Sequence, residues 1–122
     1  MRTIKFRAWS ETKKKMAKVQ SYNFETMAAH LIFDDHQSET IGTFIPMQFT
    51  GLLDSKGKEI YEGDLIKMPR TNIPWVIGWD NKKSRYCFIY YPEGHPAFAI
   101  TTTNLKKYEI IGNIYETPDL IK

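Results

Sequence analysis

The feature that most constrains the fold is the stretch of residues 48–67, QFTGLLDSKGKEIYEGDLIK, in which two tight turns separate short strand-forming segments. Asp54 and Gly57 take the first and fourth places of a type I turn, which are places that these residue types favour. A second turn follows at Glu62-Gly63-Asp64, where glycine admits a positive φ and the Asp64 carboxylate can accept backbone N–H groups. This spacing predicts short strands and tight turns from Gly51 onward.

Five short strands are predicted in the C-terminal part, at residues 65–68, 75–79, 85–91, 97–101 and 109–115. Short strands joined by tight turns are typical of small barrels, and the Gly-Asp step before the first of them favours an SH3-like barrel. The period-2 rule places Trp75, Ile77 and Trp79 on one face, which we expect to be buried. Tyr90 and Tyr91 point to opposite faces, so one of them is a candidate for an exposed binding aromatic.

The N-terminal part begins with a predicted hairpin of residues 3–9 and 16–22, joined by the polar turn 10–15. Ile4, Phe6 and Ala8 alternate with Lys5, Arg7 and Trp9, so one face of the first strand is predicted to be apolar and the other basic and aromatic. A further strand is predicted at residues 41–49, where Pro46 requires an edge or a bulge.

Between these strands, residues 23–33 are predicted to form a short helix. Asn23 suits an N-cap, and four apolar residues follow at the i, i+3, i+4, i+7 spacing of a helical face: Phe24, Met27, Ala28 and Leu31. A third hairpin is the alternative. The predicted fold class is therefore α+β, mainly β, in which an SH3-like small β-barrel is preceded by an N-terminal β-hairpin and a short helix. Residues 1–48 hold the hairpin and the helix, and residues 49–122 form the barrel domain.

The composition favours a folded protein of the cytoplasm. Of the 122 residues, 42% are hydrophobic and 14% are aromatic, which argues against disorder. No apolar run approaches the roughly 18 residues of a membrane span, and the N-terminus lacks the apolar core of a signal peptide. The single cysteine, Cys87, allows no intramolecular disulfide and is expected to be a small buried hydrophobe in a reducing compartment.

The net charge of +3 is divided into blocks. Residues 1–20 carry seven basic residues and one acidic residue, which gives +6, residues 21–66 carry two and eight, which gives −6, and the remainder carries +3. Opposite blocks can bind separate partners, and the basic one suits nucleic acid. They can also complement each other within one chain or between identical copies.

Motifs for catalysis and for metal binding are weak. His30, His36 and His95 lack the spacing of zinc ligands, and the lysines at 56 and 58 stand where a calcium loop needs oxygen ligands. A carboxylate pair can serve hydrolysis only if one member is desolvated, which the polar stretch 54–64 does not indicate. We therefore expect neither metal nor cofactor, and no enzyme activity. An enzyme with an unrecognised carboxylate site is the second alternative.

Binding is the role that the residues support best. The candidate surface is the basic and aromatic N-terminal strand with the lysine turn that follows it, namely Arg2, Lys5, Arg7, Trp9, Lys13, Lys14 and Lys15. Cations around an indole suit single-stranded nucleic acid, because phosphates pair with Lys and Arg while a base stacks on the ring. The same residues also suit a subunit interface in which Arg7 stacks on Trp9.

Three segments together resemble the YopX family of small proteins carried by bacteriophages and prophages. The central stretch matches the family pattern T-G-L-x-D-x-x-G-K-x-I-Y-E-G-D, while KFRAW at residues 5–9 resembles its opening and IGNIYETPDLI at residues 111–121 its close. The resemblance implies an SH3-like barrel and a phage setting in the cytoplasm of a bacterial host, and it implies no particular reaction. The motif residues are expected to be structural turn residues: Gly51, Asp54, Gly57, Tyr61, Glu62, Gly63 and Asp64.

The sequence therefore predicts a phage-encoded or prophage-encoded accessory protein that acts by binding and self-assembly rather than catalysis. Its expected partners are further copies of itself and a host or phage protein, and no association with a membrane is expected. The first alternative is a nucleic-acid-binding protein that uses the basic and aromatic N-terminal strand.

Overall fold

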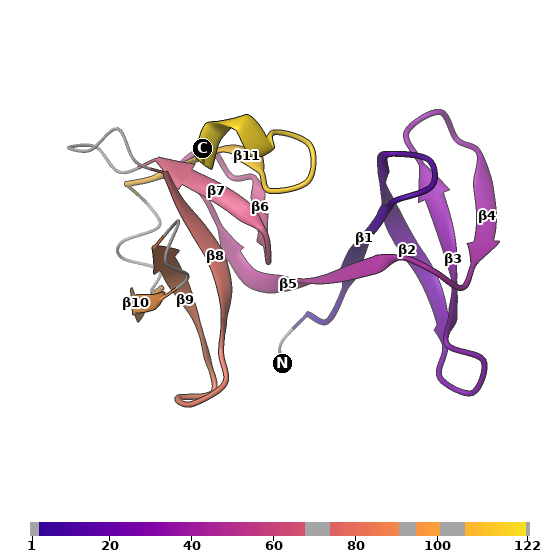
Figure 1. Cartoon of the computed structure of the whole chain (residues 1–122), viewed down its shortest axis with the longest axis horizontal. Coiled ribbons are helices and arrows are strands. Elements are labelled where there is room, and N and C mark those ends of the chain that lie inside the picture. Colours follow the sequence, from indigo (N-terminus) through magenta and orange to yellow (C-terminus); the bar gives the residue numbers. More distant parts are fainter. Residues whose placement is uncertain (1–2, 68–73, 91–94, 101–106, 122) are drawn as a thin grey trace. The chain divides into compact units, whose positions relative to one another are not determined.

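The chain folds into antiparallel β-sheet in a computed structural model that describes residues 3–67, 74–90, 95–100 and 107–121. In these ranges the helical structure is a single 3-10 helix, Pro118–Ile121. The chain divides into two compact units, one of residues 3–48 and one of residues 49–122 (Figure 1). Each unit is described by itself below.

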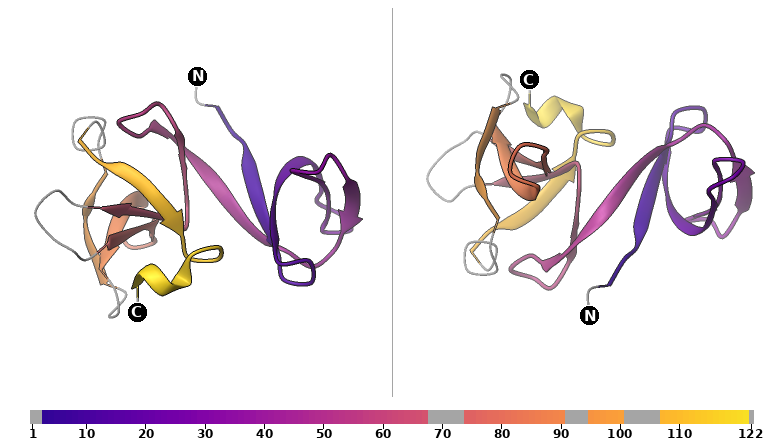
Figure 2. Two further views of the ribbon diagram at one scale, coloured as in Figure 1. Left: turned by 90° about the horizontal axis from the view of Figure 1, so that it is seen from above. Right: turned by 90° about the horizontal axis from the view of Figure 1, so that it is seen from below.

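The first unit is a sheet in the order β4-β3-β2-β1-β5. Its strands are β1 Phe6–Ser10, β2 Lys15–Asn23, β3 Ala28–Phe33, β4 Ser38–Ile41 and the first half of β5 Ile45–Leu53. The predicted hairpin of β1 and β2 is confirmed, with Arg7 opposite Lys18 and Ser10 opposite Lys15. Figure 2 shows these strands curving strongly around the core of the unit.

The predicted helix over residues 23–33 is wrong, because this segment is a tight turn followed by β3. Asn23 does cap a turn: its Oδ1 accepts the N–H groups of Glu25 and Thr26, and the Met27 N–H donates to the Asn23 carbonyl. The helical path ends there, since Met27 takes a φ of 61°. From there the chain pairs with β2 and β4, and alternate residues of β3 enter the core. Eleven residues are too few for a stable helix without tertiary packing, so strand pairing wins.

The core of the first unit is built from alternate residues of its strands, namely Ala8, Ala17, Ala29, Leu31 and Phe33. Ala8 is buried, in agreement with the predicted apolar face of β1. The rest of that prediction is wrong: Ile4 and Phe6 are exposed, whereas Trp9 and Ser10 are buried. Alternation predicts one buried face only where the other face is exposed, and both faces are covered in the second half of β1.

The second unit contains a five-stranded antiparallel sheet in the order β10-β9-β8-β7-β11. Its strands are β7 Asp64–Lys67, β8 Pro74–Asp80, β9 Arg85–Tyr90, β10 His95–Ala99 and β11 Glu109–Asn113. The second half of β5 also belongs to this unit and pairs with β6, Glu59–Tyr61. The five strands predicted in this region are all present, each displaced by no more than two residues at its ends.

The predicted SH3-like barrel and the α+β class are wrong. In the described residues β10 and β11 lie at opposite edges of the sheet order, and no pairing joins them into a closed barrel. The fold is therefore nearly all β, with two antiparallel sheets. Short strands and turns are local features that the sequence predicts well, whereas closure depends on pairing between segments far apart in the chain.

The core of the second unit is built from residues of β6, β7, β8, β9 and β11, namely Ile60, Ile66, Ile77, Phe88 and Ile110. The predicted burial of the Trp75, Ile77 and Trp79 face is confirmed for Ile77 and wrong for Trp79, which is 41% exposed. The prediction for Tyr90 and Tyr91 concerns side chains outside the described residues.

Cys87 lies on β9 and is fully buried, as predicted. Burial raises the pKa of its thiol, and the nearby Asp80 carboxylate raises it further. None of the helices in the described residues has the length and apolar character needed to span a bilayer.

Candidate functional site

An apolar groove with a volume of about 540 Å³ lies in the first unit. Its lining is aromatic and aliphatic and carries no charged side chain, and it comprises Phe6, Val19, Tyr22, Phe24, Met27, Gly42, Phe44 and Pro46. The Tyr22 ring meets the rings of Phe24 and Phe44 edge to face, at centroid distances of 4.8 and 6.0 Å. The groove can therefore take apolar side chains.

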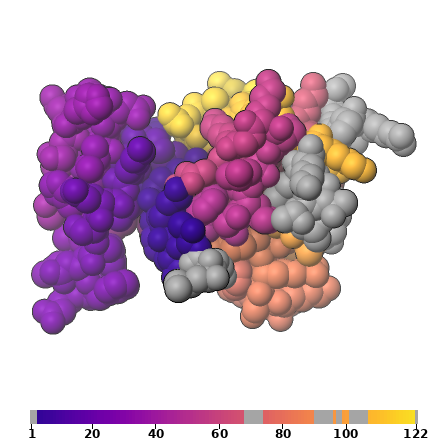
Figure 3. Space-filling view, turned by 180° about the vertical axis from the view of Figure 1, so that it is seen from behind, coloured from indigo at the N-terminus to yellow at the C-terminus, as the bar shows by residue number. Residues whose placement is uncertain are grey.

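The tip of the β2–β3 hairpin forms one wall of this groove and stands out from the first unit (Figure 3). Its two apolar side chains are largely in solvent, with 86% of Phe24 and 64% of Met27 exposed. Asn23 fixes the backbone of the tip through the three hydrogen bonds described above. A rigid turn thus presents two unburied apolar side chains beside an apolar hollow.

Met27 is an unfavourable residue for its own conformation. Its positive φ belongs to the left-handed region, where glycine or asparagine is favoured and a longer side chain costs about 1 to 3 kcal/mol. Its side chain gains little burial in return, since it is mostly exposed. Met27 is thus a strained and exposed apolar residue at the edge of the groove.

The lysine turn between β1 and β2 has carboxylate partners within the chain. Lys13 Nζ lies 2.5 Å from Glu39, Lys14 Nζ lies 2.7 Å from Glu11, and Lys15 Nζ lies 3.6 Å from Asp35. Lys13 also lies over the ring of Phe33. The basic and acidic blocks therefore meet inside one chain at Lys13 and Lys15, whereas Lys14 pairs with Glu11 of its own block.

The structure separates the other residues of the predicted basic and aromatic row. Lys5 is exposed and Arg7 is half-buried, but Trp9 is only 6% exposed. Stacking of a base needs an exposed ring face, which a buried indole does not offer. Arg2 lies outside the described residues.

Asp54 of the family motif anchors the turn predicted at residues 54–57. Its Oδ1 accepts the N–H groups of Lys56 and Lys58 at 2.9 and 2.8 Å, and its Oδ2 accepts the Ile110 N–H at 3.1 Å. The Gly57 N–H donates to the Asp54 carbonyl, and Gly57 has a φ of 82°. This buried carboxylate therefore joins the turn to β11, which is distant in sequence.

The second motif turn has the geometry that the sequence predicts. Gly63 has a φ of 88°, and the Asp64 carboxylate accepts the Tyr61 N–H at 2.8 Å. Gly63 donates its own N–H to Ile77 and accepts the N–H of Ile114 at its carbonyl. Gly51, with a φ of 87°, lies at the irregular pairing of β5 with β6, and Glu62 is half-buried. These residues hold strands together around the turn.

The closing segment of the chain forms a turn that hydrogen bonds to Asn113 and Thr117 hold in place. Asn113 Oδ1 accepts the N–H groups of Tyr115 and Glu116 at 3.0 and 2.8 Å. The Thr117 hydroxyl donates to the Asn113 carbonyl and accepts the Asn113 N–H. Gly112 fits beneath this turn, since a Cβ there would lie 2.1 Å from Thr117 Oγ1.

The motif carboxylates are arranged for structure. Asp54 and Asp64 are buried and bonded to backbone N–H groups, and for Asp54 these bonds favour the ionised form. Within the described ranges, no three His, Cys, Asp or Glu side chains gather closely enough to hold a metal ion.

Stability should fall in acid, because ionised Asp54 is part of the fold. Burial alone would raise the pKa of this carboxyl, but the N–H groups of Lys58, Ile110 and Lys56 together hold it below its usual value. The stabilisation is therefore complete above the unfolded pKa of about 3.9 and is lost as pH falls through the lower pKa of the folded state. Urea unfolding between pH 7 and pH 3 measures this effect, and Asp54→Asn should reduce the pH dependence. An equally steep loss of stability in that variant would contradict the assignment.

The groove was not predicted from the sequence, although two of its residues were noticed as part of the expected helix. Phe24 and Met27 fit the apolar spacing of a helix, and the predicted helix over residues 23–33 includes both. The sequence signal against a helix is local, since Asn23 is followed by four residues that a tight turn accommodates. The hollow itself requires β1, β2 and β5 to lie together, which local patterns do not specify.

Comparison with known proteins agrees with the motif. The YopX protein family matches residues 5–122. The chain is similar over its full length to a solved structure described as the crystal structure of protein EF1440 from Enterococcus faecalis, with a TM-score of 0.68, 25% identity and 100% coverage of both chains. No curated protein matches the chain. The two motif turns, the closing segment and the nearly complete match together show that the chain belongs to the YopX family.

Proposed function

We propose that this protein is a phage or prophage accessory protein that acts by binding and self-assembly rather than by catalysis. The observation that carries the proposal is the apolar groove of the first unit, with Phe24 and Met27 exposed on its wall. The phage setting rests on the resemblance of the central motif to that of phage-carried proteins.

The occupant that the groove suits is a second copy of the same chain. One patch of surface carries both the projecting side chains and an apolar hollow beside them. A two-fold interface uses the same patch on both subunits, so residue i of one contacts residue j of the other and the reverse. The Phe24 ring of each copy can thus enter the hollow of its partner.

The apolar groove replaces the opposed charge blocks as the proposed basis of assembly. Lys13, Lys14 and Lys15 each have a carboxylate partner within the chain. Exposed ion pairs contribute about 0 to 1 kcal/mol, so exchanging them for pairs between copies would gain little. Burial of aromatic side chains is the stronger source of association energy.

We expect Phe24→Glu to abolish self-association. A carboxylate at this position would have to lose its water to enter an apolar groove. Size-exclusion chromatography with light scattering at increasing concentration should move the wild-type mass toward twice the 14.3 kDa of one chain and leave the variant at one chain. The control is Ile111→Glu, which places the same charge at an exposed apolar position of the second unit. A monomeric wild type at every concentration would overturn the proposal.

Met27→Gly separates a binding role from a structural one. Glycine accepts the positive φ without strain, so the thermal midpoint should stay the same or rise. Self-association should nevertheless weaken, because an apolar side chain of the patch is lost. A variant that is destabilised and associates normally would show that Met27 serves the fold instead.

A further inference from the structure

The end of the β8–β9 hairpin in the second unit carries an exposed Trp79 paired with a half-buried Tyr86, next to cations, a feature that the proposed function does not use. Trp79 and Tyr86 face each other across the two strands, with ring centroids 4.9 Å apart and an interplanar angle of 74°. Trp79 is 41% exposed. The pair continues the core face of the sheet beyond the buried Ile77 and Phe88, toward the turn of the hairpin.

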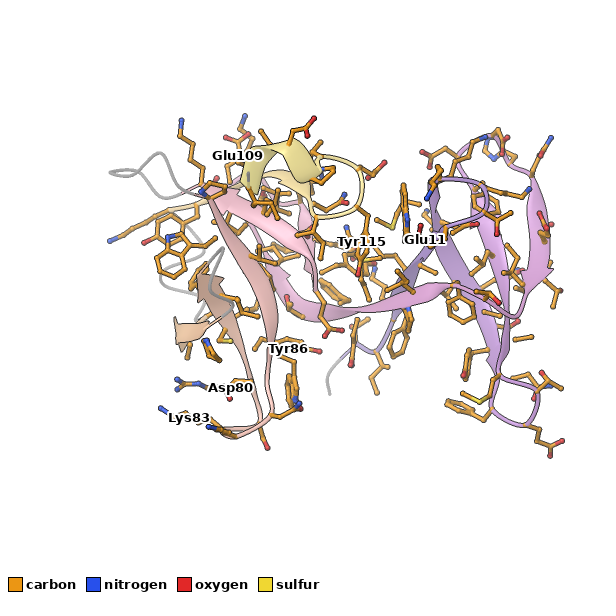
Figure 4. The ribbon with its side chains drawn as sticks, in the orientation of Figure 1. Glu11, Asp80, Lys83, Tyr86, Glu109 and Tyr115 are labelled. Carbon is orange, nitrogen blue, oxygen red and sulfur yellow. The ribbon has the colours of Figure 1, made fainter. Side chains whose placement is uncertain are left out.

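The turn beyond this pair is basic. Residues 79–86 carry Lys82, Lys83 and Arg85 against Asp80, which gives a local charge of +2. The Asp80 carboxylate is buried and accepts the N–H groups of Lys82 and Lys83 at 3.0 and 3.4 Å, so it serves the turn. Figure 4 shows Asp80 and Lys83 at the end of the hairpin and Tyr86 nearby along β9.

The lysines of this turn differ from those of the β1–β2 turn. Lys82 and Lys83 are exposed, and neither forms an ion pair with another residue that the structure describes. Lys13, Lys14 and Lys15 all have carboxylate partners. The two turns contain similar residues, but the cations of the second are available to a ligand.

We propose that the end of the β8–β9 hairpin binds single-stranded nucleic acid. A base can stack on the exposed Trp79 indole, which Tyr86 holds in place, while Lys82 and Lys83 contact the flanking phosphates. Stacking on the indole needs an unpaired base. The bases of a duplex are stacked on one another and expose no ring face to the protein. The chemistry is common to DNA and RNA, because it uses the base and phosphate and not the sugar.

The experiment is fluorescence anisotropy with labelled 20-nucleotide oligothymidylate, oligouridylate and a 20-base-pair DNA duplex, titrated with the protein from low to physiological salt. We expect both single strands to bind more tightly than the duplex. Trp79→Ala should weaken single-strand binding roughly 5-fold to 150-fold, the contribution of one stacked base. Oligodeoxyuridylate, which differs from oligouridylate in the sugar alone, assigns any preference between the two single strands to DNA or RNA.

The lysines are tested through the salt dependence. Joint replacement of Lys82 and Lys83 by alanine should reduce the slope of log affinity against log salt by about 1.4, because each single-strand phosphate contact contributes about 0.7. The matched control replaces Lys14 and Lys15 by alanine, which removes the same charge from a turn whose lysines are paired. That control should leave the slope close to wild type.

Three results would overturn the proposal: no binding to either single strand at low salt, equal losses from the two lysine pairs, or binding that Trp79→Ala does not change. If Trp79→Ala unfolds the protein, as circular dichroism would show, Trp79→Leu keeps an apolar contact with Tyr86 and still removes the flat ring. Phe24→Glu should bind the oligonucleotides normally, because the groove belongs to the first unit. Failure of one proposal therefore leaves the other intact.

Discussion

Asp54→Ala should lower the free energy of unfolding by about 3 to 5 kcal/mol, the largest effect that we expect from a single substitution. The buried carboxylate accepts three backbone N–H groups, and hydrogen bonds to a charged group contribute about 1.5 to 3 kcal/mol each. Lys56 and Lys58 can bond to water in the variant, whereas the buried Ile110 N–H loses its partner. Urea unfolding monitored by circular dichroism measures the change.

Two further variants identify the source of this effect. Asp54→Asn keeps one side-chain oxygen as an acceptor, but its amide NH₂ group cannot accept the remaining backbone N–H groups. This variant should therefore lose about half as much stability as Asp54→Ala. Asp35→Asn is the control, because Asp35 also accepts a backbone N–H, from Gln37, but in an exposed turn. It should change stability by less than about 1 kcal/mol. Similar losses at Asp35 and Asp54 would show that the tie to β11 contributes nothing special.

Gly112→Ala is expected to destabilise the protein by about 2 to 3 kcal/mol. The added methyl group would lie 2.1 Å from Thr117 Oγ1 and 3.3 Å from Leu120 Cδ1. Thr117 cannot withdraw freely, since its hydroxyl bonds both the N–H and the carbonyl of Asn113. Crowding of a packed site costs about 1 to 3 kcal/mol, and loss of the hydrogen bonds between Asn113 and Thr117 adds to this cost.

The control for this substitution is Gly42→Ala. Gly42 has no atom within 4 Å of the position that its Cβ would take, so alanine should be tolerated there. Thermal unfolding of both variants gives the comparison. A midpoint for Gly112→Ala equal to that of Gly42→Ala would mean that the closing segment moves away at little cost, and that its contacts do not stabilise the second unit.

The family motif shows how much of the site could be predicted from local chemistry. The Asp54 and Gly63 turns were recognised because aspartate and glycine have conformational preferences that act within four residues. The bond from Asp54 to Ile110 was not foreseen, since nothing local connects residues 56 positions apart. The motif is therefore structural in two senses: it forms turns, and it attaches them to the far end of the chain.

The N-terminal unit shows the opposite case. Residues 23–33 carry the apolar spacing of a helix as well as the alternation of a strand, and local propensity favoured the helix. The structure adopts the strand because β2 and β4 supply backbone partners on both sides, with Ala29, Leu31 and Phe33 buried. Trp9 and Trp79 exchanged their expected environments for the same reason, since exposure depends on what covers a face.

The family, the positions of the turns and most of the strands could be predicted from local sequence patterns, because these depend on residue preferences and on contacts between near neighbours. Tertiary structure alone decided which strands pair, that the second sheet stays open, which lysines have partners and where the apolar groove lies. Those outcomes depend on segments far apart in the chain coming together. Their energies are sums over contacts between distant residues, which local sequence patterns do not specify.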